Sequence, residues 1–237
     1  PRPPPGRHAL RPLKVRPAMQ NLADDPKVWT GSDYEFDFIA QNVFYPIYDV
    51  IAGDILKRTQ SMQGRLIDIG CGGGHLGMAL MEKTGHQGYF VDINETALKI
   101  ARKRAGERGL AGRCFFSRQD VHAMDFPDGF ADLIVSRGSY HFWQDLEKAL
   151  LEIYRILAPR GRTYIGGGMG NSELEAAIRE KMQGLQPGWP ENIRRRTQSI
   201  PTAKLENMLT RQGISHEIVE NPEQGRWIIL AKEPDHP

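Results

Sequence analysis

The stretch that decides the fold is Leu66-Ile67-Asp68-Ile69-Gly70-Cys71-Gly72-Gly73-Gly74-His75-Leu76-Gly77. An apolar run ends in an acid and several glycines, and apolar residues return as Met78-Ala79-Leu80-Met81. This pattern predicts a buried strand, a tight turn and the start of a helix. Glycine lacks a Cβ atom and accepts a positive φ, so a turn of this kind lets the backbone press against a ligand. We expect the turn to hold something small and polar.

Two interpretations of this turn are open. Gly72, Gly74 and Gly77 fit G-x-G-x-x-G, the dinucleotide fingerprint, which is a weak signal alone. The same segment also reads Asp-x-Gly-x-Gly-x-Gly from Asp68 to Gly74, and in this form it resembles the class I S-adenosylmethionine-dependent methyltransferases. The resemblance implies that the glycine loop wraps the methionine and ribose parts of the cofactor, while Asp68 helps to hold its amino-acid end. The loop residues concerned are Gly70, Cys71, Gly72 and Gly74.

Composition bounds the class of protein. The chain has 237 residues, 40% of them apolar, which is enough for one α/β core. Its 31 basic and 29 acidic residues are too balanced to indicate a nucleic-acid binder by charge alone. Two cysteines make neither a disulfide framework nor a metal site, and no apolar run is long enough for a membrane span. We expect a soluble cytoplasmic protein.

The first sixty residues divide into two parts. Residues 1–20 are rich in proline and basic side chains, which predicts a disordered tail. Apolar residues recur at helical spacing from Asp33 to Lys57, and Pro46 should kink or split that segment. In the methyltransferases that the chain resembles, such helices lie over the cofactor. That resemblance places Tyr34, Phe44 and Tyr45 at the cofactor, within a helical cover of residues 33–60.

A second strand is expected at residues 87–92 and ends in an acid, Asp92. A carboxylate in this place can accept hydrogen bonds from both ribose hydroxyls of an adenosine, with Ile93 beside it. The alternative is that Asp92 caps the helix that begins near Glu95. That helix carries a basic run, which we interpret as a solvated face. The run comprises Lys99, Arg102, Lys103, Arg104 and Arg108.

A third strand, at residues 114–117, is followed by Asp120 and Val121. The resemblance implies that Asp120 takes the exocyclic amine of adenine and that Val121 flanks the ring. A nicotinamide enzyme has no need of an adenine-reading acid at this position, so Asp120 favours the methyltransferase interpretation.

The loop after the fourth strand, at residues 131–135, is both aromatic and polar. In a doubly wound sheet it would face the ligand crevice outside the carboxyl ends of the strands. His141 is a candidate general base, Tyr140 could orient an acceptor, and Arg137 is the third catalytic candidate. Ser136 is assigned to the cofactor. The alternative for His141 is a packing role beside the aromatic residues that follow it.

The C-terminal half completes the fold. Apolar residues predict a helix from Leu146 to Leu157 that residues 159–161 would end, and then a fifth strand at 163–165. Ser172 and Glu175 predict a capping box. Residues 171–212 form an insertion that resembles a substrate lid and contain Arg194, Arg195 and Arg196, from which we hypothesise an anionic substrate. The last two strands should form an antiparallel hairpin.

The fold class expected is α/β, with a doubly wound, seven-stranded, mostly parallel sheet, helices on both faces and an antiparallel C-terminal hairpin. The resemblance covers residues 33–232 as a single domain and is strongest to the small-molecule branch that includes quinone-type C-methyltransferases. It implies S-adenosylmethionine as cofactor and in-line transfer of its methyl group to a small molecule. No Asn-Pro-Pro-Tyr motif follows the fourth strand, which disfavours a nucleic-acid substrate. The alternatives are an NAD(P)-dependent oxidoreductase and a non-catalytic protein that binds the methyl donor.

Overall fold

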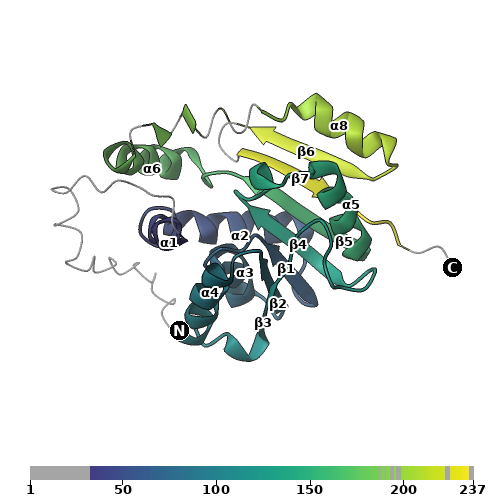
Figure 1. The fold of residues 1–237 in the computed structure, drawn as a ribbon, viewed down its shortest axis with the longest axis horizontal. Helices are drawn as coiled ribbons and strands as arrows, with labels where there is room; N and C mark the ends of the chain where they lie inside the picture. The colour runs from purple at the N-terminus through teal and green to yellow at the C-terminus, as the bar shows by residue number, and fades with distance from the viewer. Residues whose placement is uncertain are drawn as a thin grey trace, which may run out of the picture.

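A seven-stranded sheet crosses the protein in the order β3-β2-β1-β4-β5-β7-β6 (Figure 1). The computed structural model describes residues 33–186, 188–189, 191–192, 195, 199–221 and 225–234, with side chains from residue 36 onward. The strands are β1 (Arg65–Ile69), β2 (Gln87–Asp92), β3 (Cys114–Arg118), β4 (Ala131–Arg137), β5 (Leu157–Gly167), β6 (His216–Asn221) and β7 (Gly225–Leu230).

Strand direction confirms the expected fold class. Strands β1 to β5 pair in parallel, whereas β7 runs antiparallel to both β5 and β6. The chain goes outward from β1 through β2 to β3 and then returns to place β4 on the other side of β1. This reversal of strand order opens a crevice at the carboxyl ends of β1 and β4, where ligands bind in such sheets.

Helices cover both faces of the sheet (Figure 1). The α-helices are α1 (Asp33–Asn42), α2 (Tyr45–Thr59), α3 (His75–Lys83), α4 (Glu95–Glu107), α5 (Leu146–Ile156), α6 (Ser172–Leu185) and α8 (Thr202–Arg211), with short 3₁₀ turns at Ala111–Arg113 and Tyr140–Phe142. No helix among the described residues has the length and apolar character needed to span a bilayer.

Alternating side chains divide the core into two clusters, because successive residues of a strand point to opposite faces. Leu66 and Leu133 pack with α1, α2, α3, α4 and α6. Ile67 and Ile134 pack on the other face with α5 and α8. Each central strand is therefore buried on both sides, which explains its continuous apolar sequence.

The N-terminal segment forms two helices, as its helical spacing predicts. The break falls at Val43 and Phe44, and Pro46 occupies the first turn of α2, where the absence of an N–H costs no hydrogen bond. Apolar side chains of α2 enter the core, among them Ile47, Ile51 and Ile55, each at most 3% exposed. The proposed tail at residues 1–20 lies outside the described residues.

Two local predictions in the C-terminal half were wrong. Residues 159–161 do not separate the helix from the strand: α5 ends at Ile156 and β5 begins at once, with a register shift against β4 between Ala131 and Leu133. The cap of α6 is Asn171, whose side chain accepts a hydrogen bond from the Leu174 amide at 2.9 Å. Asparagine is as good a cap as serine, so the sequence allowed either start.

Gly166 provides a test of the close packing of β5 against β7. A Cβ atom there would overlap the Arg226 carbonyl oxygen and lie 2.9 Å from Trp227 Cα, both of them backbone atoms that cannot turn aside. We expect Gly166→Ala to lower the free energy of unfolding by about 1–3 kcal/mol. Gly106→Ala is the matched control, because nothing lies within 4 Å of that helical position, and it should raise stability by about 0.5–1 kcal/mol. Urea unfolding measures the free energy of unfolding of both variants. Equal changes in the two would contradict the close packing at Gly166.

Candidate active site

A cavity of about 530 Å³ lies at the carboxyl ends of β1, β2 and β4. Its size is in the range of small-molecule sites. The glycine turn forms one wall, and cover helices α1 and α2 contribute side chains above it. The residues used below are drawn from a lining that includes Asp37, Tyr48, Asp68, Gly70, Cys71, Gly72, Gly73, His75, Asp92, Ile93, Asp120, Val121, Arg137, Phe142 and Trp143.

The glycine turn needs its glycines for two different reasons. Gly72 has φ +52° and no atom within 4 Å of where its Cβ would stand, so its backbone faces open space. Gly74 has φ +77°, and a Cβ there would lie 2.7 Å from the Met78 side chain. The turn is tied to the neighbouring strand by the Cys71 amide, which donates to the Val91 carbonyl at 3.1 Å. A ligand can therefore approach the backbone at Gly72, while Gly74 lets α3 start close to the sheet.

Asp92 lines the cavity and does not cap α4. Its Oδ2 atom accepts a hydrogen bond from the Gly72 amide and its Oδ1 atom accepts one from the Asn94 amide, each at 2.9 Å. The cap of α4 is Asn94, which accepts from the Thr96 amide. The Asp92 carboxylate is thereby fixed at the mouth of the glycine turn, where a ribose diol could meet it.

Asp120 stands at the rim on the other side of β2. Its Oδ1 atom accepts hydrogen bonds from the His122 amide at 2.9 Å and from Nδ1 of the same ring at 2.5 Å. These two bonds lower the pKa of Asp120, so it is ionised near neutral pH. Ile93, 63% exposed, and the buried Val121 also line this part of the cavity. The three residues predicted to surround an adenine therefore lie in one region.

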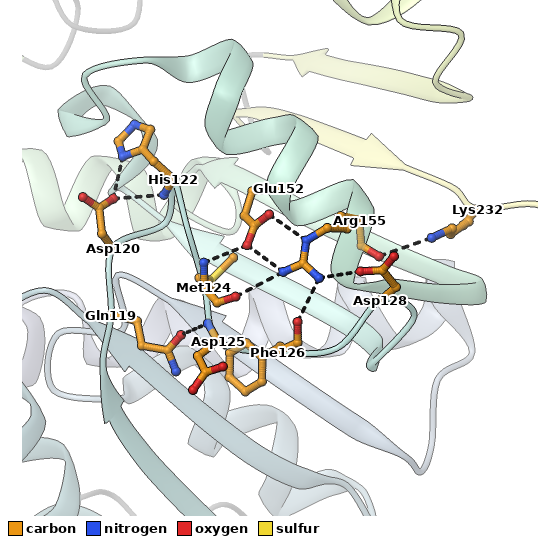
Figure 2. A network of polar contacts seen from close by, with 10 residues as sticks. All are labelled: Gln119, Asp120, His122, Met124, Asp125, Phe126, Asp128, Glu152, Arg155 and Lys232. Carbon is orange, nitrogen blue, oxygen red and sulfur yellow. Dashed lines mark hydrogen bonds and ion pairs between the residues drawn. The ribbon is translucent and has the colours of Figure 1, made fainter.

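Arg155 of α5 holds the loop that carries Asp120 (Figure 2). Its guanidinium donates to the carbonyls of Met124 and Phe126 and pairs with Glu152 and Asp128. Glu152 in turn accepts from the Met124 amide at 2.7 Å. The loop between β3 and β4 is thus pinned from the face opposite the cover helices.

Asp68 is buried at the end of β1. Its Oδ2 atom accepts a hydrogen bond from the Gly77 amide at 2.9 Å, and a Cβ at Gly77 would stand 2.9 Å from that same oxygen. Burial raises the pKa of Asp68 to about 7, and the nearby Asp92 adds to the effect. The Asp68 carboxyl can therefore lose its proton near neutral pH when a cation binds close to it, as a group facing a cationic ligand would need.

Three polar side chains join the cover to the glycine turn. Asp37 of α1 pairs with Arg104 of α4 at 2.8 Å and with His75 of α3 at 3.2 Å, and Arg104 also donates to the Gly73 carbonyl. The His75 ring stacks on Tyr48 of α2, with centroids 4.9 Å apart. Burial raises the pKa of Asp37, but hydrogen bonds from His75 and Arg104 outweigh it and leave that pKa lowered. We name this group, Asp37, His75 and Arg104, the cover latch.

Arg137 is the one predicted catalytic residue that reaches the cavity. Its guanidinium lies over the rings of Phe44 and Tyr48 at 5.2 and 5.3 Å, and Nη2 donates to the Gly168 carbonyl at 3.1 Å. The side chain comes from the end of β4, next to the point where the strand order reverses.

Tyr140, His141 and Ser136 do not line the cavity, which corrects their assignment. Tyr140 is 1% exposed and packs in the core cluster of α5 and α8. The His141 ring packs against it at a tilt of 36°, with ring centroids 3.8 Å apart. Ser136 is fully buried, and its hydroxyl meets that of Ser139 at 2.5 Å behind the wall. The 3₁₀ turn at Tyr140–Phe142 rotates Phe142 toward the cavity in their place.

Phe44 and Tyr45 of the cover helices also lie elsewhere than the sequence analysis predicts. Tyr45 is 43% exposed, lies beside Arg108 and is not at the cavity. Phe44 packs against Trp189 and reaches the site only through Arg137. The side chain of Tyr34 lies outside those described. Tyr48 lines the cavity instead, although nothing in its sequence context distinguishes it from its neighbours.

The lid arginines contribute nothing that the structure describes at the cavity. Arg195 is exposed and hydrogen-bonds Asn192, while Arg194 and Arg196 lie outside the described residues. Arg104 reverses another expectation, because it is 9% exposed and belongs to the cover latch, not to a solvated face. A signal for it existed: Arg104 is three residues from Ala101 and adjacent to Ala105, both fully buried.

Comparisons with known proteins agree with this geometry. A methyltransferase domain family model matches residues 67–165. The chain is 38% identical over 102 residues to a demethylmenaquinone methyltransferase of Thermus thermophilus, a match that covers 43% of this chain and 46% of that one. It is 32% identical over 103 residues to a ubiquinone/menaquinone biosynthesis C-methyltransferase of Serratia proteamaculans, covering 43% and 41%. The chain thus matches less than half the length of these curated relatives.

A solved structure extends the similarity along the chain. A Methanococcus maripaludis protein, described as an S-adenosyl-L-methionine-dependent methyltransferase, shares 38% identity and a TM-score of 0.81. The match covers 86% of this chain and 93% of that one. The similarity therefore extends well beyond the residues matched by the family model.

The raised pKa of Asp68 makes a prediction about stability. The unfolded carboxyl ionises near pH 4 and the folded one near pH 7, so the stability that the protonated group contributes is lost as pH rises through that window. Asp68→Asn keeps an acceptor for the Gly77 amide without the charge. We expect the melting temperature of this variant, relative to the unsubstituted protein, to increase from pH 5 to pH 8. A difference independent of pH would contradict the raised pKa.

The cover latch can be tested by a paired substitution. Asp37→Asn removes the charge that Arg104 needs inside the protein and should lower the free energy of unfolding by about 1–3 kcal/mol. Asp49→Asn is the matched control on the neighbouring helix, because the Asp49 side chain is 75% exposed and its pair with Lys83 should contribute at most about 1 kcal/mol. Hydrogen exchange should accelerate in α1 for the first variant alone. Equal behaviour of the two would refute the latch.

Proposed function

We propose that this chain catalyses the reaction of the family to which it belongs, the S-adenosylmethionine-dependent methyltransferases, with a small molecule as the methyl acceptor. The cofactor is S-adenosylmethionine. The observation that carries the proposal is the single cavity edge on which the glycine turn, Asp68, Asp92 and Asp120 meet. The acceptor and its attacking atom are proposals for this chain, since the curated relatives share less than half their length with it.

The residues present fit the cofactor. Open backbone at Gly72 leaves room for a ligand, and Asp92 is fixed beside it by two backbone amides. We infer that Asp92 receives the ribose hydroxyls, that Asp120 receives the adenine amine between Ile93 and Val121, and that Asp68 lies toward the amino-acid end. When bound, the cofactor supplies a methyl group activated by the positive sulfonium.

The protein then has to position and desolvate the reactants. Holding two groups for in-line displacement can contribute about 7–11 kcal/mol of the barrier. Cover helices α1 and α2 lie over one side of the cavity, where Tyr48 of α2 stacks on His75 of α3, and we infer that this contact keeps water from that side. His141 and Tyr140 do not line the cavity, so we propose catalysis by proximity and desolvation without a general base from that turn.

Two alternatives remain from the sequence, an NAD(P)-dependent oxidoreductase and a non-catalytic protein that binds the methyl donor. The fixed, ionised carboxylate of Asp120 at the third strand favours an adenine-reading site over a nicotinamide site. A measurement of methyl transfer separates an enzyme from a protein that only binds the methyl donor. A cytoplasmic setting stays a prediction from the cysteine content.

We also propose that the acceptor is anionic. Arg195, the described member of the lid arginines, lies outside the cavity and gives this proposal no support. Its support comes from Arg137, a cationic side chain in the cavity wall.

The cofactor is tested by thermal shift with the full chain. S-adenosylmethionine and its demethylated product should raise the melting temperature, since a ligand at a hundred times its dissociation constant adds about 2.7 kcal/mol to stability, whereas NAD and NADP should not. Asp92→Ala should remove most of the shift. Glu95→Ala is the matched control, an exposed acid three residues on that does not line the cavity.

Turnover is then measured with a methyl-labelled donor and a cell extract. Label in a small-molecule fraction supports the enzyme, while label retained only in the cofactor supports a binding protein. A thermal shift with NADH and none with the methyl donor would overturn the proposal.

A further inference from the structure

Arg137 has hydrogen-bonding capacity that the described protein does not use. Nη2 donates to the Gly168 carbonyl at 3.1 Å, but Nε is buried with no hydrogen-bond partner among the described residues. An N–H group left unsatisfied away from water costs free energy, and more so when it belongs to a cation. The side chain lines the cavity, so a ligand bound there meets a cation whose hydrogen-bonding capacity is not filled.

The charge of Arg137 is uncompensated as well. No salt bridge joins it to an acidic side chain in the described part of the chain, and the acids of the cavity are engaged elsewhere. Asp37 pairs with Arg104, Asp68 with the Gly77 amide and Asp92 with the Gly72 amide. Burial lowers the pKa of Arg137 and Tyr48 counters part of that effect, but a guanidinium stays protonated at any physiological pH.

Aromatic rings hold the guanidinium in place. The guanidinium carbon lies 5.2 Å from the ring centroid of Phe44, at the N-terminal end of α2, and 5.3 Å from that of Tyr48, one turn later. Stacking of this kind stabilises the cation and restricts its rotation. A guanidinium that is already oriented can offer two parallel N–H groups to one planar oxyanion with little further loss of entropy.

The position of Arg137 separates it from the adenosine end of the cavity. Asp92 ends β2 and Asp120 follows β3, both on one side of β1. Arg137 ends β4, on the other side of β1, and reaches to Gly168 just beyond β5. A cofactor with its adenosine between Asp92 and Asp120 therefore leaves the Arg137 side for the reacting partner.

We propose that the methyl acceptor is a small organic acid whose carboxylate pairs with Arg137, with an apolar or aromatic body beside Phe142 and Trp143. This inference rests on the proposed function and names the substrate class for its site. The carboxylate would satisfy the buried guanidinium and would also place negative charge in a cavity that holds a positive sulfonium. Phe142 and Trp143 line the cavity and supply the apolar surface for the rest of the acceptor.

The test uses the full chain saturated with S-adenosylhomocysteine and a panel of matched probes: benzoate, 4-hydroxybenzoate and phenylacetate, each beside its neutral amide. Calorimetry should show at least one carboxylate binding at least tenfold more tightly than its amide. Arg137→Met should abolish that preference. Arg137→Lys should weaken carboxylate binding severalfold, because a lysine keeps the charge and loses the planar fork. Absence of binding by every carboxylate, or a preference that survives in Arg137→Met, overturns the inference.

Arg102→Met is the matched control. Arg102 also lies over a phenyl ring, that of Phe116 at 5.3 Å, but it is exposed and outside the cavity. It should leave the carboxylate preference unchanged, and an equal loss in both variants would count against Arg137. If Arg137→Met fails to fold, two other measurements decide the test. They are the effect of Arg137→Lys and the ratio of carboxylate to amide affinity in the unsubstituted protein.

A second arm asks which molecule supplies the carboxylate. S-adenosylhomocysteine carries one, whereas 5′-methylthioadenosine lacks the amino-acid end. If Arg137 binds the acceptor, Arg137→Met should change the affinity of neither compound by more than about twofold. Selective weakening of S-adenosylhomocysteine would assign Arg137 to the cofactor and overturn the acceptor class. Cofactor binding and labelled-methyl transfer are measured separately, so these failures leave the proposed function standing.

Discussion

The Asp68 carboxyl accepts the Gly77 amide at 2.9 Å in the interior of the protein, and the geometry of the cavity depends on that bond. It joins the end of β1 to the first turn of α3, so the glycines between them must turn back within a few residues. That turn directs the Gly72 amide to Asp92 and exposes the backbone that faces the cavity. A strand end, a helix start and the next strand are thereby fixed relative to one another by two acids and two backbone amides.

Sequence reasoning succeeded where chain periodicity and covalent adjacency decide the result. The strand from Arg65 to Ile69 and the strand from Gln87 to Asp92 follow from apolar runs bounded by turn residues, and the acids at their ends cannot lie anywhere but at the carboxyl edge of the sheet. Asp120 and Val121, which also line the cavity, were singled out by the family resemblance and not by periodicity. The antiparallel end of the sheet followed from two apolar strands joined by a short turn.

It failed where a side chain's direction depends on a turn of irregular geometry or on partners distant in sequence. The 3₁₀ turn after β4 buries Tyr140, keeps His141 out of the cavity lining and presents Phe142 to it, an arrangement that no periodicity reports. Arg104 sits in a run of basic residues, and its partners inside the protein, Asp37 and the Gly73 carbonyl, lie 67 and 31 residues earlier. Arg155 is similar, since its bonds to Met124 and Phe126 join elements that the sequence separates by about thirty residues.

The reversal of strand order at β1 divides the cavity between two segments of the chain. One half is built by the β1-to-β3 segment with its glycine turn, Asp92 and Asp120, and the other by the end of β4, the turn that follows it and helix α2. Substitutions in the second half, at Arg137 or Phe142, leave the hydrogen bonds of the first intact. Evolution or protein engineering could therefore change the acceptor while the methyl donor stays the same. A library of variants confined to positions 44, 48, 137, 142 and 143 would sample new acceptors and leave the cofactor-binding residues unchanged.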